Sequence, residues 1–101
     1  MIFRFLDTTH ARAFAATIVT DYDRLRRSAA MRGDSAEKWR LKREKLVQRF
    51  DQYCREHKPN FYKKAKMIQV IQNGLEEKGI AAGDIGVFLN DAMVKRLKQP
   101  R

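Results

Sequence analysis

Gly33-Asp34-Ser35-Ala36-Glu37 separates two long stretches in which apolar residues recur at helical spacing. Gly33 belongs to the residue type that most often ends a helix, and either Asp34 or Ser35 can cap the following helix with its side chain. Glu37 lies three residues after Asp34, which is the spacing of a capping box. The sequence therefore predicts two consecutive helices joined by a short turn at this point.

The apolar residues on either side of this turn have the spacing of two amphipathic helices. The first helix is expected to start near Asp7 or Thr8, and its apolar series is Ala11, Phe14, Ala15, Ile18, Tyr22, Leu25 and Ala29. The second helix is expected to end at Pro59, because proline cannot continue the backbone ladder. Its apolar series is Trp39, Leu46, Phe50, Tyr53 and Cys54.

Two further helices are predicted in the second half of the chain. Asn60 can cap a third helix that runs to Gly79, with the apolar series Phe61, Ala65, Ile68, Ile71 and Leu75. A fourth helix is expected from about Asp84, with the series Ile85, Phe88, Leu89, Ala92, Met93 and Leu97. Beyond the first few residues, no stretch alternates with the period of a strand. The predicted fold is an all-α, compact, four-helix bundle-like single domain over residues 1–101.

Two apolar features exceed what one bundle core requires. Val87 and Val94 fall on the face of the fourth helix opposite its main apolar series, so that helix is either central in the bundle or shared with a second subunit. Residues 1–7 form an apolar amino-terminal segment that can pack on the domain or on a partner. A homodimer is therefore one predicted state of the protein.

The composition excludes several classes of protein. The chain has 101 residues, of which 44% are hydrophobic and 34% are charged, so it can form a core without a metal or a disulfide. Cys54 is the sole cysteine, which argues against a secreted disulfide framework. No segment approaches the roughly 20 apolar residues that cross a bilayer. We therefore expect a cytoplasmic protein that does not associate with membranes.

The excess positive charge lies in one part of the chain. The whole sequence has 22 Lys and Arg against 12 Asp and Glu, a formal net charge of +10. Residues 24–66 contain fifteen of these cations and five of the carboxylates, so the entire excess lies within that segment. Concentrated positive charge attracts polyanions over distances of several residues. The sequence therefore predicts binding to nucleic acid, either DNA or RNA.

Four cations of the second helix form the main predicted contact. At 100° per residue they share a strip about 60° wide and about 16 Å long beside the apolar face. These residues are Lys38, Lys42, Lys45 and Arg49, and no carboxylate lies in the strip between its ends. On the other flank the cations have acidic partners three or four residues away, in the pairs Glu37–Arg40, Arg40–Glu44 and Asp51–Arg55. We predict that the strip contacts phosphates and that the other flank is neutralised.

Other candidate contacts lie near the ends of helices. Lys63, Lys64 and Lys66 open the third helix, where the helix dipole disfavours cations, so we interpret them as ligand contacts. Arg26 and Arg27 are also candidates, although cations near the carboxyl end of a helix have a structural role as well. Trp39, Tyr53 and Phe61 are expected in or beside the core. Among the aromatic residues near the cations, Tyr62 is the best candidate for an exposed ring that stacks on a base.

No motif for catalysis or sequence-specific recognition is present. His10, His57 and Cys54 lack the spacing of metal ligands and a third group to orient a nucleophilic pair. A helix-turn-helix over residues 75–92 would lack side chains that read base edges. We therefore predict a protein that is not an enzyme, needs no cofactor or metal, and binds the nucleic-acid backbone with weak sequence preference. The alternative is a small helical adaptor or assembly subunit that binds an acidic protein partner.

Overall fold

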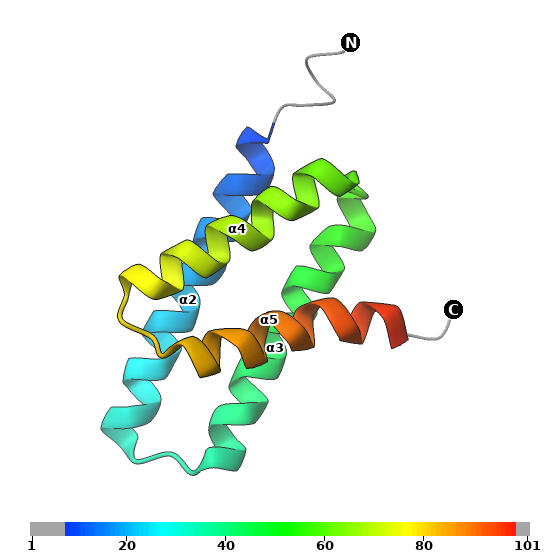
Figure 1. Cartoon of the computed structure of the whole chain (residues 1–101). Helices are drawn as coiled ribbons and strands as arrows, with labels where there is room; N and C mark the ends of the chain where they lie inside the picture. Colours follow the sequence, from blue (N-terminus) through cyan, green and yellow to red (C-terminus); the bar gives the residue numbers. More distant parts are fainter. Residues whose placement is uncertain (1–7, 99–101) are drawn as a thin grey trace.

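Residues 8–98 of the protein fold into four helices connected by short turns (Figure 1). The computed structural model describes the backbone of residues 8–98 and the side chains of residues 8–93. The helices are α2 (Thr9–Arg32), α3 (Ala36–His57), α4 (Phe61–Glu77) and α5 (Ala82–Lys98). Every regular element within residues 8–98 is a helix, which confirms the predicted all-α, bundle-like fold.

The turn between α2 and α3 follows from its local sequence. Gly33 adopts a left-handed conformation (φ 68°), and its N–H and that of Asp34 donate to the last carbonyls of α2. The hydroxyl of Ser35 accepts a hydrogen bond from the backbone N–H of Lys38 at 3.2 Å. Ser35 is therefore the cap of α3, and the carboxylate of Asp34 remains available for another partner.

The other two turns also use the residue types expected for helix ends. Asn60 caps α4 by accepting a hydrogen bond from the N–H of Lys63 at 2.8 Å. Gly79 has a φ of 80° in the turn after α4, which suits glycine. The fourth helix begins at Ala82, two residues before the predicted start at Asp84.

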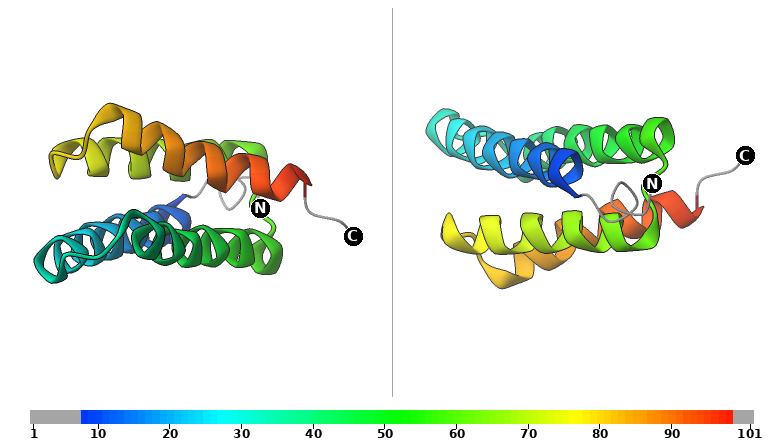
Figure 2. Two further views of the ribbon diagram at one scale, coloured as in Figure 1. Left: turned by 90° about the horizontal axis from the view of Figure 1, so that it is seen from below. Right: turned by 90° about the horizontal axis from the view of Figure 1, so that it is seen from above.

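The four helices form two layers. The helical hairpin of α2 and α3 is one layer, and α4 and α5 form the other (Figure 2). Helix α4 packs on α2, and α5 crosses α3 (Figure 1). None of the described helices contains a segment long and apolar enough to cross a membrane.

The hydrophobic core lies between these layers. Tyr22 of α2 is its central aromatic residue. Its ring packs edge-to-face with the rings of Trp39 and Phe88, and the ring centroids are 5.3 and 5.1 Å from that of Tyr22. The two helices α2 and α4 approach closely where Gly74 lies against the side chain of Val19. The largest fully buried side chains come from all four helices and are Tyr22, Phe50, Phe88, Ile18, Leu46, Met67, Ile71, Leu75, Val47 and Cys54.

Helix α4 is rotated relative to the sequence prediction. Its buried stripe is Met67, Ile71 and Leu75, whereas Phe61 is 87% exposed and Ala65 is also exposed. The prediction that Phe61 belongs to the core is therefore wrong. Trp39 and Tyr53 do lie in or against the core, as predicted.

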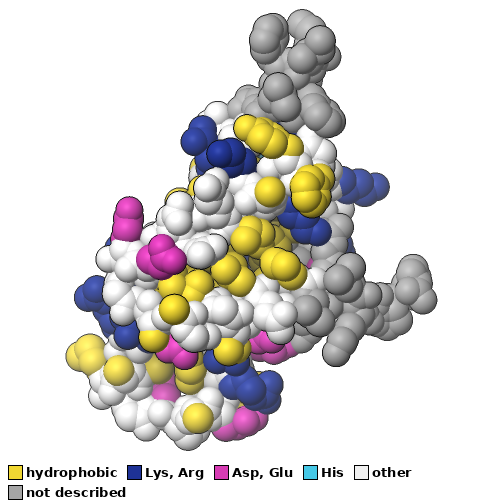
Figure 3. All heavy atoms as spheres, in the orientation of Figure 1, with side chains coloured by type: hydrophobic (Ala, Val, Ile, Leu, Met, Phe, Trp, Pro, Cys, Tyr) yellow, Lys and Arg dark blue, Asp and Glu magenta, His cyan; other side chains and the backbone are white. Residues whose placement is uncertain are grey.

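Apolar side chains also remain on the outside of the α4–α5 layer. Val87 is 47% exposed, so central burial is not the explanation for this residue, and Met93 is exposed to the same degree. In Figure 3 apolar side chains form a band across this layer, with charged side chains mostly around it. The side chain of Val94 and all of residues 1–7 lie outside the described residues, and the homodimer inferred from them stays a prediction.

Candidate nucleic-acid interface

Cations from α2 and α3 face one another along the line where these two helices meet. We call this surface the basic seam. Two carboxylates, Asp21 and Asp34, bind cations on it. Its cations are Arg24, Arg32, Lys38, Lys42, Lys45 and Arg49.

Asp21 links the two helices at one part of the seam. Its Oδ2 accepts a short hydrogen bond from Nη1 of Arg49, and its Oδ1 lies 3.4 Å from Nη2 of Arg24. The hydrogen bond from Arg49 is the main reason why the pKa of Asp21 lies below its usual value. One carboxylate thus serves two guanidinium groups and holds Arg49 of α3 against α2.

Asp34 has the same role near the turn. Nζ of Lys42 donates to its Oδ2 at 2.6 Å, and this hydrogen bond is the largest cause of a lowered pKa for Asp34. The charges of Lys38 and Arg32 lower that pKa further. All four residues line a concave site of about 390 Å³, which Leu41 and Lys45 complete. Four cations and one carboxylate therefore line this hollow.

The prediction that the α3 strip is uncompensated is wrong for two of its four residues. Lys42 and Arg49 have acidic partners, which come from the turn and from α2, eight and 28 residues away in the sequence. Lys38 and Lys45 are exposed, and neither forms a salt bridge within the described part of the chain. The six cations of the seam still exceed its two carboxylates, which leaves a local charge of +4.

The opposite flank of α3 has the neutralised character expected for it. Arg40 pairs with Glu37 and Arg55 pairs with Asp51, each at 2.8 Å. A longer contact of 3.9 Å joins Arg43 to Asp91 of α5. The excess charge of α3 is therefore greatest on the side of the seam.

Arg26 and Arg27 lie elsewhere on α2 and share one carboxylate. They contact Asp23 at 3.3 and 3.0 Å. Burial alone would raise the pKa of Asp23, but hydrogen bonds and charge from the two arginines outweigh it, and the pKa lies below its usual value. These two candidates therefore have a structural partner and are not part of the basic seam.

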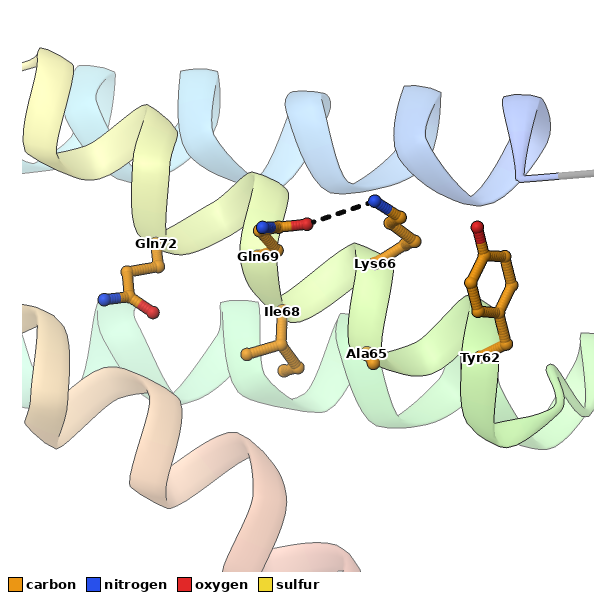
Figure 4. A pocket seen from close by; sticks show the side chains of 6 residues that line it. All are labelled: Tyr62, Ala65, Lys66, Ile68, Gln69 and Gln72. Carbon is orange, nitrogen blue, oxygen red and sulfur yellow. Dashed lines mark hydrogen bonds between the residues drawn. The ribbon is translucent and has the colours of Figure 1, made fainter.

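The candidates on α4 lie in the other layer. Tyr62 is 45% exposed, as predicted, and its ring borders a shallow hollow of about 390 Å³ with Lys66 (Figure 4). Nζ of Lys66 lies 3.4 Å from Oε1 of Gln69. Lys63 and Lys64 are half-buried, and Lys63 lines a separate pocket beside His10 and His57. The structure therefore does not join the ten predicted residues into one surface.

Two members of the seam are missing from the sequence prediction. Arg24 and Arg32 are not among the predicted contacts, because cations near the carboxyl end of a helix have a structural role. Their spacing of eight residues keeps them on one side of α2, and this spacing was the available signal. Which side of α2 meets α3 depends on the tertiary packing.

Neither a metal-ligand cluster nor a known relative indicates a different chemistry. Among the described residues, no group of three or more His, Cys, Asp and Glu could hold a metal ion. Comparisons with protein-family models, curated proteins and solved structures gave no significant match. The geometry of the charged surface is therefore the basis on which a function can be proposed.

Proposed function

We propose that this protein binds DNA or RNA without catalysis, through contacts between the basic seam and the phosphate backbone. The observation that carries the proposal is the charge of +4 on the seam, where Lys38 and Lys45 are exposed and free of salt bridges within the described residues. Phosphate contacts from lysine and arginine supply most of the affinity in sequence-independent binding. The expected ligand preference is weak with respect to sequence.

The dimensions of the seam suit a nucleic-acid strand. The cations of α3 extend from Lys38 to Arg49, a distance of about 16 Å along the helix. One strand of duplex DNA carries a phosphate about every 3.4 Å of axis, so this length corresponds to about five phosphates. Several cations can therefore contact one strand at the same time.

The two carboxylates support such contacts although they reduce the charge. Asp21 and Asp34 hold Arg49 and Lys42 in defined positions. A long side chain that is already ordered loses less conformational entropy when it binds a phosphate. The seam thus combines positioned cations with exposed ones.

The proposal is tested by removing the two cations that have no salt bridge. In the Lys38→Gln, Lys45→Gln double variant, the slope of log K against log salt for duplex DNA should shrink by about 0.9 per lost contact, or about 1.8 in total. Fluorescence anisotropy at four salt concentrations measures this slope. The control is the Arg12→Gln, Lys78→Gln double variant, which loses the same charge at exposed positions outside the seam.

Two results would contradict the proposal. An equal change of slope in the control would mean that total charge, and not the seam, determines the binding. If the wild-type protein binds neither duplex DNA, single strands nor structured RNA at low salt, the alternative applies. The chain would then be a small helical adaptor or assembly subunit, and the seam would contact an acidic protein partner.

The proposed compartment is the cytoplasm, where a protein with one cysteine is kept reduced. Cys54 is fully buried, so its main role is that of a small core residue.

A further inference from the structure

A second cationic site lies where α2 begins, α3 ends and α4 begins (Figure 1). It is a concave pocket of about 370 Å³. We propose that this pocket binds a phosphate group. We call it the histidine–lysine pocket, and its polar residues are His10, Tyr53, His57, Lys58, Asn60 and Lys63.

The charge of the pocket has one sign. Lys58 and Lys63 supply two cations, and neither forms a salt bridge within the described residues. No described Asp or Glu lines the pocket. Glu56 is the acidic residue nearest in sequence to Lys58, and its carboxylate accepts a hydrogen bond from Gln52 at 3.0 Å. Among the described residues, an anion in the pocket would therefore meet lysines and imidazoles and no competing carboxylate.

The two imidazoles are held in place by aromatic neighbours. Nδ1 of His10 is hydrogen-bonded to the hydroxyl of Tyr53 at 2.7 Å. His57 stacks on the ring of Tyr53 with a centroid distance of 4.3 Å, and Tyr53 in turn stacks on Phe14 at 4.1 Å. When the hydroxyl of Tyr53 donates to Nδ1 of His10, the proton of the neutral ring is on Nε2, which can then donate to a ligand. In the protonated form of an imidazole, both ring nitrogens donate.

The backbone of Lys58 is a further indication. Its φ is 46°, and it is the only non-glycine residue with a positive φ among residues 8–98. Glycine adopts this conformation without steric cost, whereas a residue with a Cβ does not. The sequence therefore has a lysine at the pocket where glycine would favour folding. A lysine at such a position is explained if its amine contributes to binding.

This inference goes beyond the proposed function and does not depend on it, because the pocket and the basic seam share no residue. A phosphate group could come from the end of a nucleic-acid strand or from a small phosphorylated molecule. The volume of the pocket lies in the range of small-ligand sites. The shared chemistry is a terminal phosphate beside two lysines and two imidazoles.

The test is a titration of the isotopically labelled protein with inorganic phosphate, followed by amide NMR at an ionic strength held constant with chloride. We expect the largest shifts at the residues that line the pocket. The Lys58→Gly variant should bind phosphate about tenfold more weakly, since it loses a charged contact. The same variant should have a higher melting temperature without phosphate, because glycine adopts the positive φ at this position without steric strain. Weaker binding could then not be attributed to unfolding.

Two further variants complete the experiment. Lys63→Gln should also weaken phosphate binding, and Lys78→Gln, an exposed lysine outside the pocket, should leave it unchanged. Wild-type affinity in both Lys58→Gly and Lys63→Gln would overturn the proposal, and so would phosphate shifts centred on the basic seam. The Lys38→Gln, Lys45→Gln variant should keep the phosphate shifts, so failure of the proposed function is distinguishable from failure of this inference.

Oligonucleotides with and without a 5′ phosphate identify the source of the ligand. If the phosphorylated strand binds more tightly and the difference disappears in Lys58→Gly, the pocket binds a strand end. If inorganic phosphate binds in the pocket and the two strands bind equally, the pocket binds a small phosphorylated molecule. Both results support a phosphate site.

Discussion

Replacing Gly74 with alanine should destabilise this protein, although the same change in the middle of a helix usually stabilises. Alanine is favoured over glycine in a helix interior by about 1 kcal/mol. A Cβ at position 74 would lie 2.8 and 2.9 Å from the two methyl carbons of Val19 and 3.3 Å from its Cβ. Valine in a helix has one strongly preferred rotamer, so these methyl groups cannot turn away easily. Overpacking costs about 1–3 kcal/mol, so after the gain in helix propensity we expect a net loss of up to about 2 kcal/mol.

Gly86 provides the matched control for this change. It lies within α5, and a Cβ there would meet no other atom within 4 Å. Gly86→Ala should therefore raise the free energy of unfolding by about 1 kcal/mol. Urea unfolding followed by circular dichroism measures both variants, and each kcal/mol corresponds to about 4–8 °C in melting temperature. The two alanine substitutions should thus have opposite signs.

A double-mutant cycle tests whether Val19 is the cause. Val19→Ala alone loses buried surface and should destabilise the protein. In the Gly74→Ala background the same change also relieves the overlap. Val19→Ala should therefore cost less there than in the wild type, by at least about 1 kcal/mol. If Gly74→Ala stabilises the protein as much as Gly86→Ala does, or if the two substitutions are additive, then α4 does not pack closely on α2 at Gly74.

Three further predictions concern the exposure of two phenylalanines, the ion pairs of two aspartates and the burial of the cysteine. Phe61→Ser should change the free energy of unfolding by less than about 0.5 kcal/mol because the ring is exposed. Phe88→Ala should lower it by about 3–5 kcal/mol because that ring is fully buried, and urea unfolding measures both variants. Hydrogen bonds from Arg49 and Lys42 hold the pKa of Asp21 and Asp34 below 3.8, so the folded state binds fewer protons than the unfolded state there. Stability should therefore fall as the pH drops through 3.8, and the urea midpoint of an Asp21→Asn, Asp34→Asn variant should depend less on pH. The thiol of Cys54 should react with a disulfide reagent only after unfolding, and rapid reaction in the native protein would contradict its burial.

The helices and turns could be predicted because their signals are local. Gly33 adopts the left-handed conformation that ends α2, and Ser35 and Asn60 cap the next two helices with their own side chains. The choice between Asp34 and Ser35 as the cap of α3 could not be made in this way. In the structure Ser35 accepts from the N–H of Lys38, while the carboxylate of Asp34 binds Lys42, which is eight residues away in the sequence.

The buried side of α4 could not be predicted from its own sequence, because this helix has apolar residues on two overlapping faces. Ile71 and Leu75 belong to both faces. Gly74 lies against the side chain of Val19, so the face of α4 that contains Gly74 packs on α2. This rotation buries Met67 and leaves Phe61 exposed.

Only the α3 side of the basic seam could be predicted from the sequence. Helical angles place Lys38, Lys42, Lys45 and Arg49 together on one helix, but they contain no information about the neighbour. Asp21 is 28 residues from Arg49 in the sequence, and only the packing of α2 beside α3 brings them into contact. The neutral flank was easier to predict because its pairs lie within one turn of α3.

The way in which carboxylates are shared bears on the proposed ligand. In the basic seam, Asp21 contacts two arginines and Asp34 lies in the field of three cations. If stability were the only role of these carboxylates, each cation would be expected to have its own acidic partner. No repulsion between unpaired cations would then remain. Asp21 and Asp34 instead each lie among more positive charge than they neutralise. In the proposed complex, the phosphates of the nucleic acid occupy the place of the missing carboxylates, so binding relieves this repulsion and stabilises the folded protein.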